Sequence, residues 1–251
     1  MISRTFPFAA SLAAFIVVWI IAATMTADPS ILPNPLEVLG IMWLEATEGP
    51  LFEHLFATLA RVAAAFTIAM VVGVAVGVVL GKSEEANRWF GPWVTIFLNI
   101  PALVVIVLCY LWVGLSEAAA ILAVAVNKTA MVAVTIREGA AGLNPRLAEM
   151  GQIYRMSVWD RYRHIALPQL WPYIYASMRN GIAIIWKIVL VAEFLGRSNG
   201  VGFQIHLYFQ LFETGYVLAY AFAFVAIMLA IEIGIFSVAE RRTNAWARST
   251  A

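Results

Sequence analysis

Residues 55–80 read LFATLARVAAAFTIAMVVGVAVGVVL, an apolar run in which Arg61 is the only charged residue. A helix that crosses a bilayer needs about 20 mostly apolar residues, and this run is longer than that. Lipid offers no partners to backbone N–H and C=O groups, so only helices and closed barrels cross it. Barrel strands alternate polar and apolar residues, whereas this run is apolar on every face. The stretch therefore predicts a transmembrane helix.

Five further runs of the same kind occur along the chain. The sequence has 251 residues, of which 63% are hydrophobic and 12% are charged, against about 25% charged residues in a soluble domain. The first run follows Arg4 as in a signal peptide, but it is longer than a signal core of about 7–15 residues and no A-x-A site follows. We interpret it as a retained helix. The six expected spans are Phe6–Thr26, Leu55–Leu80, Pro92–Leu111, Ala118–Ile136, Tyr173–Leu195 and Tyr216–Val238.

Basic residues are distributed unevenly between these runs. If both ends of the chain are cytoplasmic, the outer segments hold only Arg197, whereas the inner segments hold 11 basic residues. Cytoplasmic loops carry an excess of Lys and Arg, so we expect both termini in the cytoplasm. The inner residues are Arg4, Lys82, Arg88, Arg137, Arg146, Arg155, Arg161, Arg163, Arg241, Arg242 and Arg248.

The segments between the runs divide the chain. Residues 28–54, expected outside, begin with prolines and continue into a weakly amphipathic helix, Leu36–Glu45. Residues 196–215, also expected outside, suit a loop and a short interfacial helix, while residues 81–91 are expected to form a short cytoplasmic turn. We divide the chain into an N-terminal helix with its outer segment (1–54), a transmembrane domain (55–240) and a cytoplasmic tail (241–251).

Three glycines, Gly73, Gly77 and Gly81, recur every four residues in the second run. Small residues on one face let helices approach closely in lipid. The spacing therefore predicts a helix-packing face and no chemistry.

The longest cytoplasmic segment reads GLNPRLAEMGQIYRMSVWDRYRHIALP from Gly142 to Pro168. Asn144 is a favourable N-cap, and Pro145 suits the first position of a helix. We expect this helix to end near Arg155.

A second helix is expected directly afterwards. Ser157 and Asp160 have the spacing of a capping box for a helix from Val158 to His164. Pro168 is expected to end that helix, because a proline disfavours helical backbone at the residue before it. The segment therefore predicts a helix–turn–helix at the membrane surface.

These two helices mix aromatic and basic side chains. A basic loop that only fixes orientation would not need two capped helices. An amphipathic basic helix binds anionic lipid headgroups or a protein partner, and the residues alone leave both interpretations open. The side chains concerned are Tyr154, Trp159, Tyr162, Arg155, Arg161 and Arg163.

Lys128 lies near the middle of the fourth run, between Asn127 and Thr129. A lysine at the bilayer centre costs about 2.5–3.5 kcal/mol on insertion scales, so we expect it to face a cavity or a partner. One interpretation is a translocation path that attracts an anionic solute. The other is an ion pair with Glu193 or Glu232, or contact with unpaired carbonyls. The candidates for a path are Asn127, Lys128 and Lys187. For Lys187 the alternative is that its side chain snorkels to the membrane interface.

Other kinds of site lack their motifs. Residues 77–83, GVVLGKS, are one residue short of a phosphate-binding loop and follow an apolar run in place of a strand. No His lies in the middle of a run, and no His, Cys, Asp and Glu cluster has metal-ligand spacing. Cys109 is the single cysteine, which excludes an intrachain disulfide. We expect no catalytic residue, no metal and no cofactor, and the net charge of +1 gives no indication of nucleic acid.

Residues 149–168 resemble the coupling motif of permease subunits of bacterial ABC importers. That motif reads Glu-Ala-Ala, three residues, Gly, nine residues, Ile-x-Leu-Pro, and the spacing matches throughout. The identities agree at Glu149, Ile165, Leu167 and Pro168. The family usually has Ala, Ala and Gly where this sequence has Met150, Gly151 and Arg155. Gly at the last position permits φ > 0, which Arg adopts at a cost of about 1 kcal/mol.

Further segments, in order over roughly residues 30–240, look like the nitrate, sulfonate and taurine type of these permeases. They are Leu32-Pro33-Asn34-Pro35, Thr58 to Arg61, Gly73 to Gly81, Ile100-Pro101, Leu111 to Gly114, Trp186-Lys187 with Glu193, and Gly200 to Gly202.

The resemblance implies an all-α, polytopic fold with six transmembrane helices and a cytoplasmic coupling helix pair. It implies a transport subunit of the bacterial inner membrane and not an enzyme, because ATP hydrolysis resides in a partner chain. Its partners would be two copies of a cytoplasmic ABC ATPase, a periplasmic or lipid-anchored solute-binding protein, and a second, identical permease copy, within membrane lipid. The residues that it implies for ATPase docking are Glu149, Gly151, Arg155, Ser157, Ile165, Leu167 and Pro168.

Two other classes would have a similar membrane part. A secondary transporter or channel without an ATPase has no need for the motif at residues 149–168. A membrane anchor of a respiratory or signalling complex would not require a polar residue at the depth of Lys128. We therefore expect the permease of an ABC importer for a small, anionic solute of the nitrate, sulfonate or taurine kind, or a related organic compound.

Overall fold

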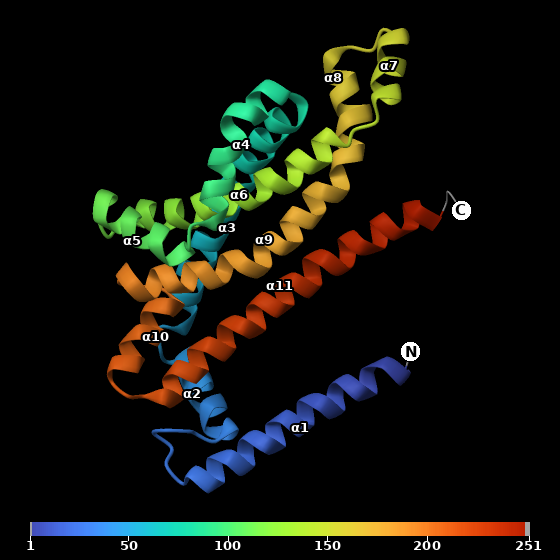
Figure 1. The fold of residues 1–251 in the computed structure, drawn as a ribbon. Coiled ribbons are helices and arrows are strands. Elements are labelled where there is room, and N and C mark those ends of the chain that lie inside the picture. Colours follow the sequence, from blue (N-terminus) through green and yellow to red (C-terminus); the bar gives the residue numbers. More distant parts are fainter. Residues whose placement is uncertain (1, 249–251) are drawn as a thin grey trace. The chain divides into compact units, whose positions relative to one another are not determined.

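The computed structural model describes the backbone of residues 2–248 and the side chains of Pro7 and residues 10–234 (Figure 1). All described elements are helical, which confirms the all-α prediction. Four residues of the charge count have side chains outside the described part: Arg4, Arg241, Arg242 and Arg248. The last three residues of the predicted tail, 249–251, also lie outside the described residues. The elements are α1 (Ile2–Thr26), α2 (Pro35–Thr47), α3 (Leu51–Lys82), α4 (Glu84–Asn99), α5 (Ala102–Val113), α6 (Glu117–Ala141), α7 (Pro145–Ile153), α8 (Val158–Arg161), the π-helix η1 (Tyr162–Ala166), α9 (Leu167–Gly196), α10 (Val201–Gln210) and α11 (Thr214–Arg248).

Three of the described helices are long and apolar enough to cross a membrane. They are α3, α6 and the part of α11 from Thr214 to Gly234. α4 and α5 add a fourth span if the pair is counted as one, and α1 contributes a shorter apolar helix, Ala10–Thr26. The predicted count of six spans is therefore not confirmed by length and composition.

The prediction of one continuous helix over Pro92–Leu111 is wrong. α4 and α5 meet at a bend of 98°, and Ile100 and Pro101 between them have extended backbone. Pro101 has no N–H to donate, and its ring disfavours helical backbone at Ile100. The apolar run therefore breaks at this pair, within the stretch that composition alone reads as continuous.

Two further boundaries differ from the predictions. The turn expected over residues 81–91 is mostly helical, because α4 begins directly after Ser83, whose hydroxyl caps it. Pro168 does not end a helix, since α8, η1 and α9 follow one another without interruption. In η1 the Leu167 N–H donates to the Tyr162 carbonyl, five residues back. This wider turn makes room for a proline ring that a regular helix would exclude.

The described chain forms two compact units. One holds the chain up to Thr58 together with Glu193–Ile233, and the other holds Leu59–Ala192 and the chain from Gly234 onward.

In the first unit, α1 and α11 are tied to the segment around α2. The Trp19 indole N–H donates to the Pro33 carbonyl at 3.1 Å, and its ring lies 5.4 Å from that of Phe222. The Tyr220 hydroxyl donates to Glu45 Oε2 at 2.5 Å. Both side chains of this last pair are buried, so a paired carboxylate lies inside the unit.

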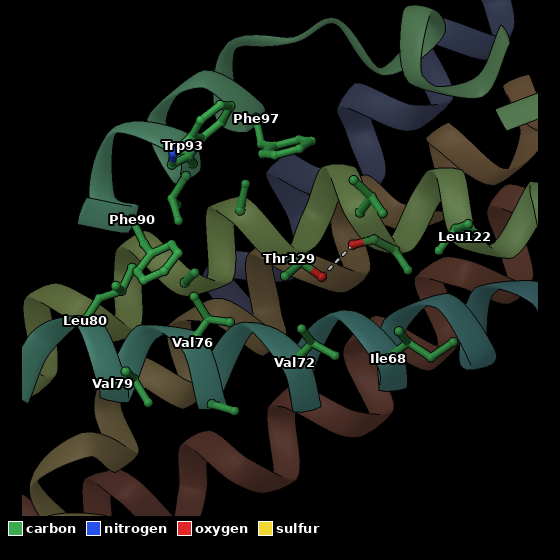
Figure 2. Close-up of a pocket in the computed structure, with 16 residues that line it drawn as sticks. Ile68, Val72, Val76, Val79, Leu80, Phe90, Trp93, Phe97, Leu122 and Thr129 are labelled. Carbon is green, nitrogen blue, oxygen red and sulfur yellow. Dashed lines mark hydrogen bonds between the residues drawn. The ribbon is translucent and has the colours of Figure 1, made fainter. Parts of the chain in front are cut away.

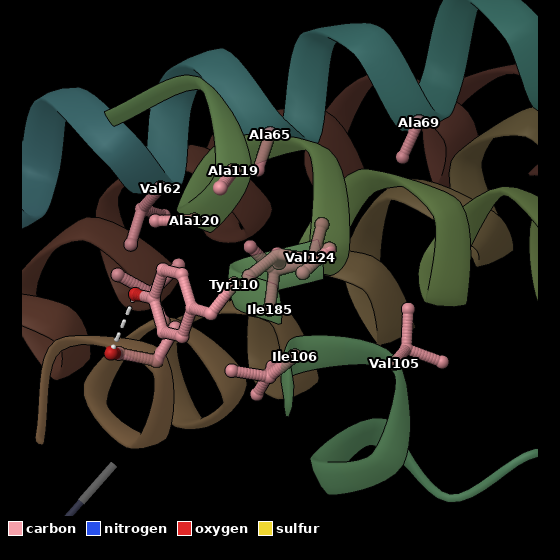
Figure 3. Packing of buried hydrophobic residues seen from close by; sticks show 13 residues of the cluster. Val62, Ala65, Ala69, Val105, Ile106, Tyr110, Ala119, Ala120, Val124 and Ile185 are labelled. Carbon is pink, nitrogen blue, oxygen red and sulfur yellow. Dashed lines mark hydrogen bonds between the residues drawn. The ribbon is translucent and has the colours of Figure 1, made fainter. Parts of the chain in front are cut away.

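In the second unit, α6 is the central helix and packs against α4 and α5. Figure 3 shows Ile106 and Tyr110 of α5 beside Val124 of α6 and Ile185 of α9. The Tyr110 hydroxyl donates to the Ala192 carbonyl at 2.8 Å. Tyr110 carries the one hydroxyl of this buried cluster, and its backbone acceptor gives it the hydrogen bond that burial away from water requires.

α3 lies against α6 along its glycine face. A Cβ atom added at Gly73 would lie 2.6 Å from Val132 Cβ. One added at Gly77 would lie 2.7 Å from the Ala133 carbonyl oxygen, and one at Gly81 would lie 2.5 Å from Ala140 Cβ. These distances leave no room for any side chain. The predicted packing role of the three glycines is confirmed.

Gly77→Ala should destabilise the protein by about 1–3 kcal/mol, as overpacking of a close helix contact does, because the new methyl group meets backbone of α6. The measurement is the thermal unfolding midpoint of the purified protein in detergent. The control is Gly40→Ala in α2, where an added Cβ meets nothing within 4 Å and helix propensity favours Ala. Equal midpoints for the two variants would contradict the contact.

Candidate functional site

The segment predicted to dock an ATPase forms a hairpin of α7 and α8 that continues through η1 into α9 (Figure 1). Asn144 Oδ1 accepts the Arg146 N–H at 3.0 Å and caps α7. Ser157 Oγ accepts the Asp160 N–H at 3.1 Å and donates to Asp160 Oδ2 at 2.6 Å, capping α8. Both predicted caps are confirmed. α7 ends at Ile153, two residues before the predicted end.

The turn between the two helices contains Arg155 in the left-handed conformation, with φ of +50°. The Arg155 N–H donates to the Gln152 carbonyl and the Met156 N–H to the Gly151 carbonyl, both at 2.9 Å. This pair of bonds is the Schellman motif, which usually has Gly at the left-handed position. Arg155 therefore keeps the turn that Gly would make.

Gly151 is the residue at which α7 approaches η1. A Cβ atom there would lie 2.8 Å from Ile165 Cδ1 and 3.1 Å from Arg161 Cγ. Gly151, where the family usually has Ala, thus lies at a close contact inside the hairpin. Gly151 and Ile165, predicted from the motif, are in this way brought together.

The hairpin exposes large apolar side chains. Ile153, Tyr154, Val158 and Trp159, here called the docking patch, are 65–79% exposed. Soluble surfaces seldom present contiguous apolar patches unless a partner or a membrane covers them. Trp159 is also stacked on Tyr162, with 6.0 Å between ring centroids. The docking patch is therefore the part of the hairpin surface that we expect a partner or a membrane to cover.

The remaining predicted docking residues surround this patch at different depths. Glu149, Arg155, Ser157 and Pro168 are exposed, and Ile165 and Leu167 are partly buried. A cavity of about 610 Å³ lies where the hairpin meets the ends of α3 and α6. Its polar lining includes Lys82, Asn144, Arg161, Tyr162 and Gln169.

Lys128 is 2% exposed. Its Nζ lies 2.7 Å from Met131 Sδ and 3.4 Å from the Asn180 carbonyl oxygen. The adjoining cavity measures about 10 Å³, which is close to the space that one water needs. Ser177 Oγ, which lines the same cavity, is buried without a hydrogen-bond partner among the described protein atoms. In this conformation the space beside Lys128 is too small for an organic anion.

The other two path candidates lie in different surroundings. Asn127 Nδ2 donates to the Ile100 carbonyl at 3.4 Å, next to the break between α4 and α5. Broken helices expose backbone groups that transporters use at solute sites, and Asn127 satisfies one of them here. Lys187 is exposed, and its Nζ lies 5.4 Å from the centroid of the Trp186 ring.

A larger hollow of about 660 Å³ differs from the cavity beside Lys128 because its lining is almost entirely apolar (Figure 2). It is lined by apolar side chains of α3, α4 and α6, among them Val72, Val76, Phe90 and Trp93. Its one hydroxyl, that of Thr129, donates to the Ala125 carbonyl at 2.7 Å. The side chains that line the hollow carry no charge, and besides Thr129 only the Trp93 indole has a polar hydrogen, so the hollow does not suit an anion although it is large enough to hold one.

Buried polar contacts were missed by sequence reasoning. Arg61, in the second run, forms a two-point ion pair with Glu117 at the start of α6, with Nε–Oε2 at 2.7 Å. The only signal was a charge in each of two neighbouring apolar regions. Glu193 is fully buried and accepts from the Thr58 hydroxyl at 2.9 Å and the Gly202 N–H at 2.8 Å. Among the residues searched, no cluster of three His, Cys, Asp or Glu side chains suits a metal ion.

Known proteins resemble this chain over most of its length. The permease protein TauC of the taurine transport system of Escherichia coli K12 is 26% identical over 233 residues, which cover 91% of this chain and 84% of TauC. The nitrate import permease protein NrtB of a Synechocystis strain is 27% identical over 207 residues, covering 78% of this chain and 74% of NrtB.

Solved structures share the fold. An inward-facing structure of the MetNI methionine ABC transporter superposes with a TM-score of 0.64 at 19% identity, covering 82% of this chain and 97% of the matched chain. A family model described as the binding-protein-dependent transport system inner membrane component matches residues 69–243. That match spans most of the chain and includes the hairpin, the broken α4–α5 pair and Lys128. This protein therefore belongs to the family of inner membrane components of binding-protein-dependent transport systems.

Proposed function

We propose that the chain is the membrane-spanning permease subunit of an ABC importer, driven by ATP hydrolysis on a separate subunit. The docking patch carries the proposal, because four apolar side chains on a capped hairpin form a surface for a partner. Glu149, Gly151, Arg155, Ser157, Ile165, Leu167 and Pro168 form or support this surface. The family to which the chain belongs supports the same role.

The assembly contains two cytoplasmic ABC ATPases, a periplasmic or lipid-anchored solute-binding protein and a second copy of this chain. Each copy crosses the inner membrane six times with both termini in the cytoplasm. α1, the bent α4–α5 pair and α9 supply the spans that length and composition leave open. The division into residues 1–54, 55–240 and 241–251 follows this topology.

The solute is a small anion. Similar permeases are named for taurine and for nitrate, and both compounds carry an anionic group. Among the described side chains, Lys128 is the most buried of the basic residues. The cavity beside it admits about one water in the present conformation, so the solute reaches Lys128 only when α6 and α9 separate there.

Co-purification tests the proposed function against its rivals. A tagged permease extracted from its native membrane in mild detergent should carry a protein that hydrolyses ATP. A secondary transporter, a channel or a membrane anchor would be isolated without it. Isolation of a fully active transport protein with no nucleotide-hydrolysing partner would therefore overturn the proposal.

Reporter fusions test the six crossings. Fusions after residues 45, 85, 150, 205 and 248 should report outside, inside, inside, outside and inside, because the basic residues concentrate in the segments assigned to the cytoplasm. A fusion at residue 205 that reports inside would contradict the topology.

Glu149→Lys should abolish transport and reduce the co-purified ATPase at least about tenfold, while the permease stays in the membrane. Reversal of an exposed charge on α7 leaves an unpaired or repulsive contact on the partner. The matched control is Glu84→Lys, an equal charge change on the exposed first turn of α4. Normal ATPase recovery and normal uptake in Glu149→Lys would show that α7 does not dock.

Lys128→Met should lower anion uptake roughly tenfold or more, since a hydrogen bond to a charged group is worth about 1.5–3 kcal/mol, while the ATPase stays bound. Lys82→Met, which removes a charge at the exposed end of α3, serves as the control. If Lys128 only joins α6 to α9 through the Asn180 carbonyl, the variant should lose thermal stability and keep its uptake per molecule. That outcome would end the path assignment.

A further inference from the structure

The small cavity beside Lys128 lies between α6 and α9 and gathers polar groups from both helices. Lys128 and Thr135 lie about two turns apart on α6, and Ser177 and Asn180 lie about one turn apart on α9. All four residues belong to the second unit. Two helices that the sequence separates therefore share one polar cavity.

The hydrogen-bond donors at this cavity have too few acceptors. Ser177 is 4% exposed, and its Oγ has no partner among the described protein atoms. Lys128 carries three N–H donors, and the acceptors near its Nζ are Met131 Sδ at 2.7 Å and the Asn180 carbonyl at 3.4 Å. Sulfur is a weak acceptor, and 3.4 Å is long for a hydrogen bond from nitrogen to oxygen. Because unpaired buried polar groups are costly, the cavity lacks a good acceptor.

The chemistry of the lining identifies the kind of atom that fits. Thr135 Oγ1 donates to the Met131 carbonyl at 3.1 Å, so its oxygen can accept one further bond. The described lining carries one positive charge and no carboxylate, which disfavours a cation. An oxygen atom placed there accepts from the Lys128 ammonium and the Ser177 hydroxyl. A water meets these requirements in the space of about 10 Å³, because a buried water needs two to four polar partners.

Asn180 places this cavity close to the surface of the described chain. It lines the cavity and is itself exposed. Under the proposed topology α9 crosses the membrane, and polar residues in such helices face the bundle interior or a water-filled space and not lipid. The exposed Asn180 therefore indicates that α9 faces a water-filled space beside the cavity.

We propose that Lys128 Nζ and Ser177 Oγ together bind one oxygen of an anionic solute of the sulfonate or nitrate kind during its passage. A water holds the same place in the present conformation. This inference rests on the proposed function and adds Ser177 of α9 as a second binding group. Since the two donors come from different helices, the site is complete only while α6 and α9 are close enough to share one oxygen.

Ser177→Ala tests the second donor in proteoliposomes that hold the permease, its ATPase and the loaded binding protein. The probe is taurine or nitrate, whichever that binding protein delivers. The amount of solute moved per ATP should fall about three- to tenfold, as the loss of one hydrogen bond predicts, because each cycle then carries solute less often. The rate of ATP hydrolysis and the recovery of the ATPase should stay at the wild-type level.

Thermal unfolding of the same variant separates binding from structure. The unfolding midpoint of Ser177→Ala should equal that of the wild type, because the hydroxyl has no protein partner among the described atoms. A lower midpoint with unchanged solute per ATP would show a structural hydroxyl and would overturn the site.

Thr129→Val is the matched control. It removes a hydroxyl next to Lys128 that donates to the Ala125 carbonyl at 2.7 Å and lines the apolar hollow. Solute moved per ATP should stay at the wild-type level in this variant. A loss as large as that in Ser177→Ala would show that removal of any nearby hydroxyl impairs transport, which contradicts a specific role for Ser177.

A double variant tests whether the two donors bind the same oxygen. If they do, Lys128→Met with Ser177→Ala should lose less than the product of the two single losses, because the groups act as a unit. Losses that multiply would mean that the two side chains act independently, and the shared site would fall.

The outcomes also separate this inference from the proposed function. Wild-type solute transport in Ser177→Ala together with reduced transport in Lys128→Met would overturn the shared site and leave the importer function standing. Uptake by the wild-type protein without any ATPase would overturn the importer function and the inference that rests on it.

Discussion

The contact of α3 with α6 is the constraint on which the second unit depends. Lipid supplies little hydrophobic drive between helices, so tight van der Waals packing has to hold them. Gly73, Gly77 and Gly81 provide it by letting α3 backbone lie directly on Val132, Ala133 and Ala140. The partners of α6 on its other faces, α4 and α5, are then fixed relative to α3. The same arrangement buries Lys128, which lies one turn from Val132 on α6.

Much of this fold was readable from the sequence, because its signals are local. Apolar length predicted most of the long helices, glycine spacing predicted a packing face on α3, and Asn144 and Ser157 predicted two caps. Local chemistry was also where prediction failed. The Ile100-Pro101 pair breaks a run that composition reads as one span, and the π-turn before Pro168 lets a helix continue past a proline. Neither a bend nor a wide turn has a hydrophobic pattern of its own.

The candidate sites differ in the same way: those formed by neighbouring residues could be predicted, and those formed by residues far apart in the sequence could not. The coupling motif is contiguous, so the sequence could predict its residues, and Arg155 has the left-handed conformation that Gly favours at that position. At the start of α10, the Thr58 hydroxyl donates to Glu193 and accepts from the Val201 N–H, residues that lie 135 and 143 positions away in the sequence. No periodicity or spacing in one sequence reports such a contact. Arg61 and Glu117, 56 residues apart, were missed for the same reason.

The hairpin, the neighbourhood of Lys128 and Glu193 are connected through one continuous helical segment. The hairpin presents the docking patch and continues through η1 into α9. α9 contains Asn180, whose carbonyl lies near Lys128, and it ends at Gly196, shortly after Glu193. Under the proposed function, a partner docked on the hairpin therefore acts on a helix whose Asn180 carbonyl lies 3.4 Å from Lys128 Nζ. Under the proposed function, the hairpin capped by Asn144 and Ser157 is the part of the chain through which the partner acts on α9.

The central claim is that ATP hydrolysis on a partner drives solute through this chain. The most direct measurement is uptake into proteoliposomes that hold the purified permease with its ATPase, given the loaded binding protein. Accumulation should require ATP on the side of the vesicle membrane where the ATPase lies. It should stop with a non-hydrolysable ATP analogue and should not change with imposed ion gradients. Accumulation by the permease alone under an ion gradient, without any ATPase, would contradict the account.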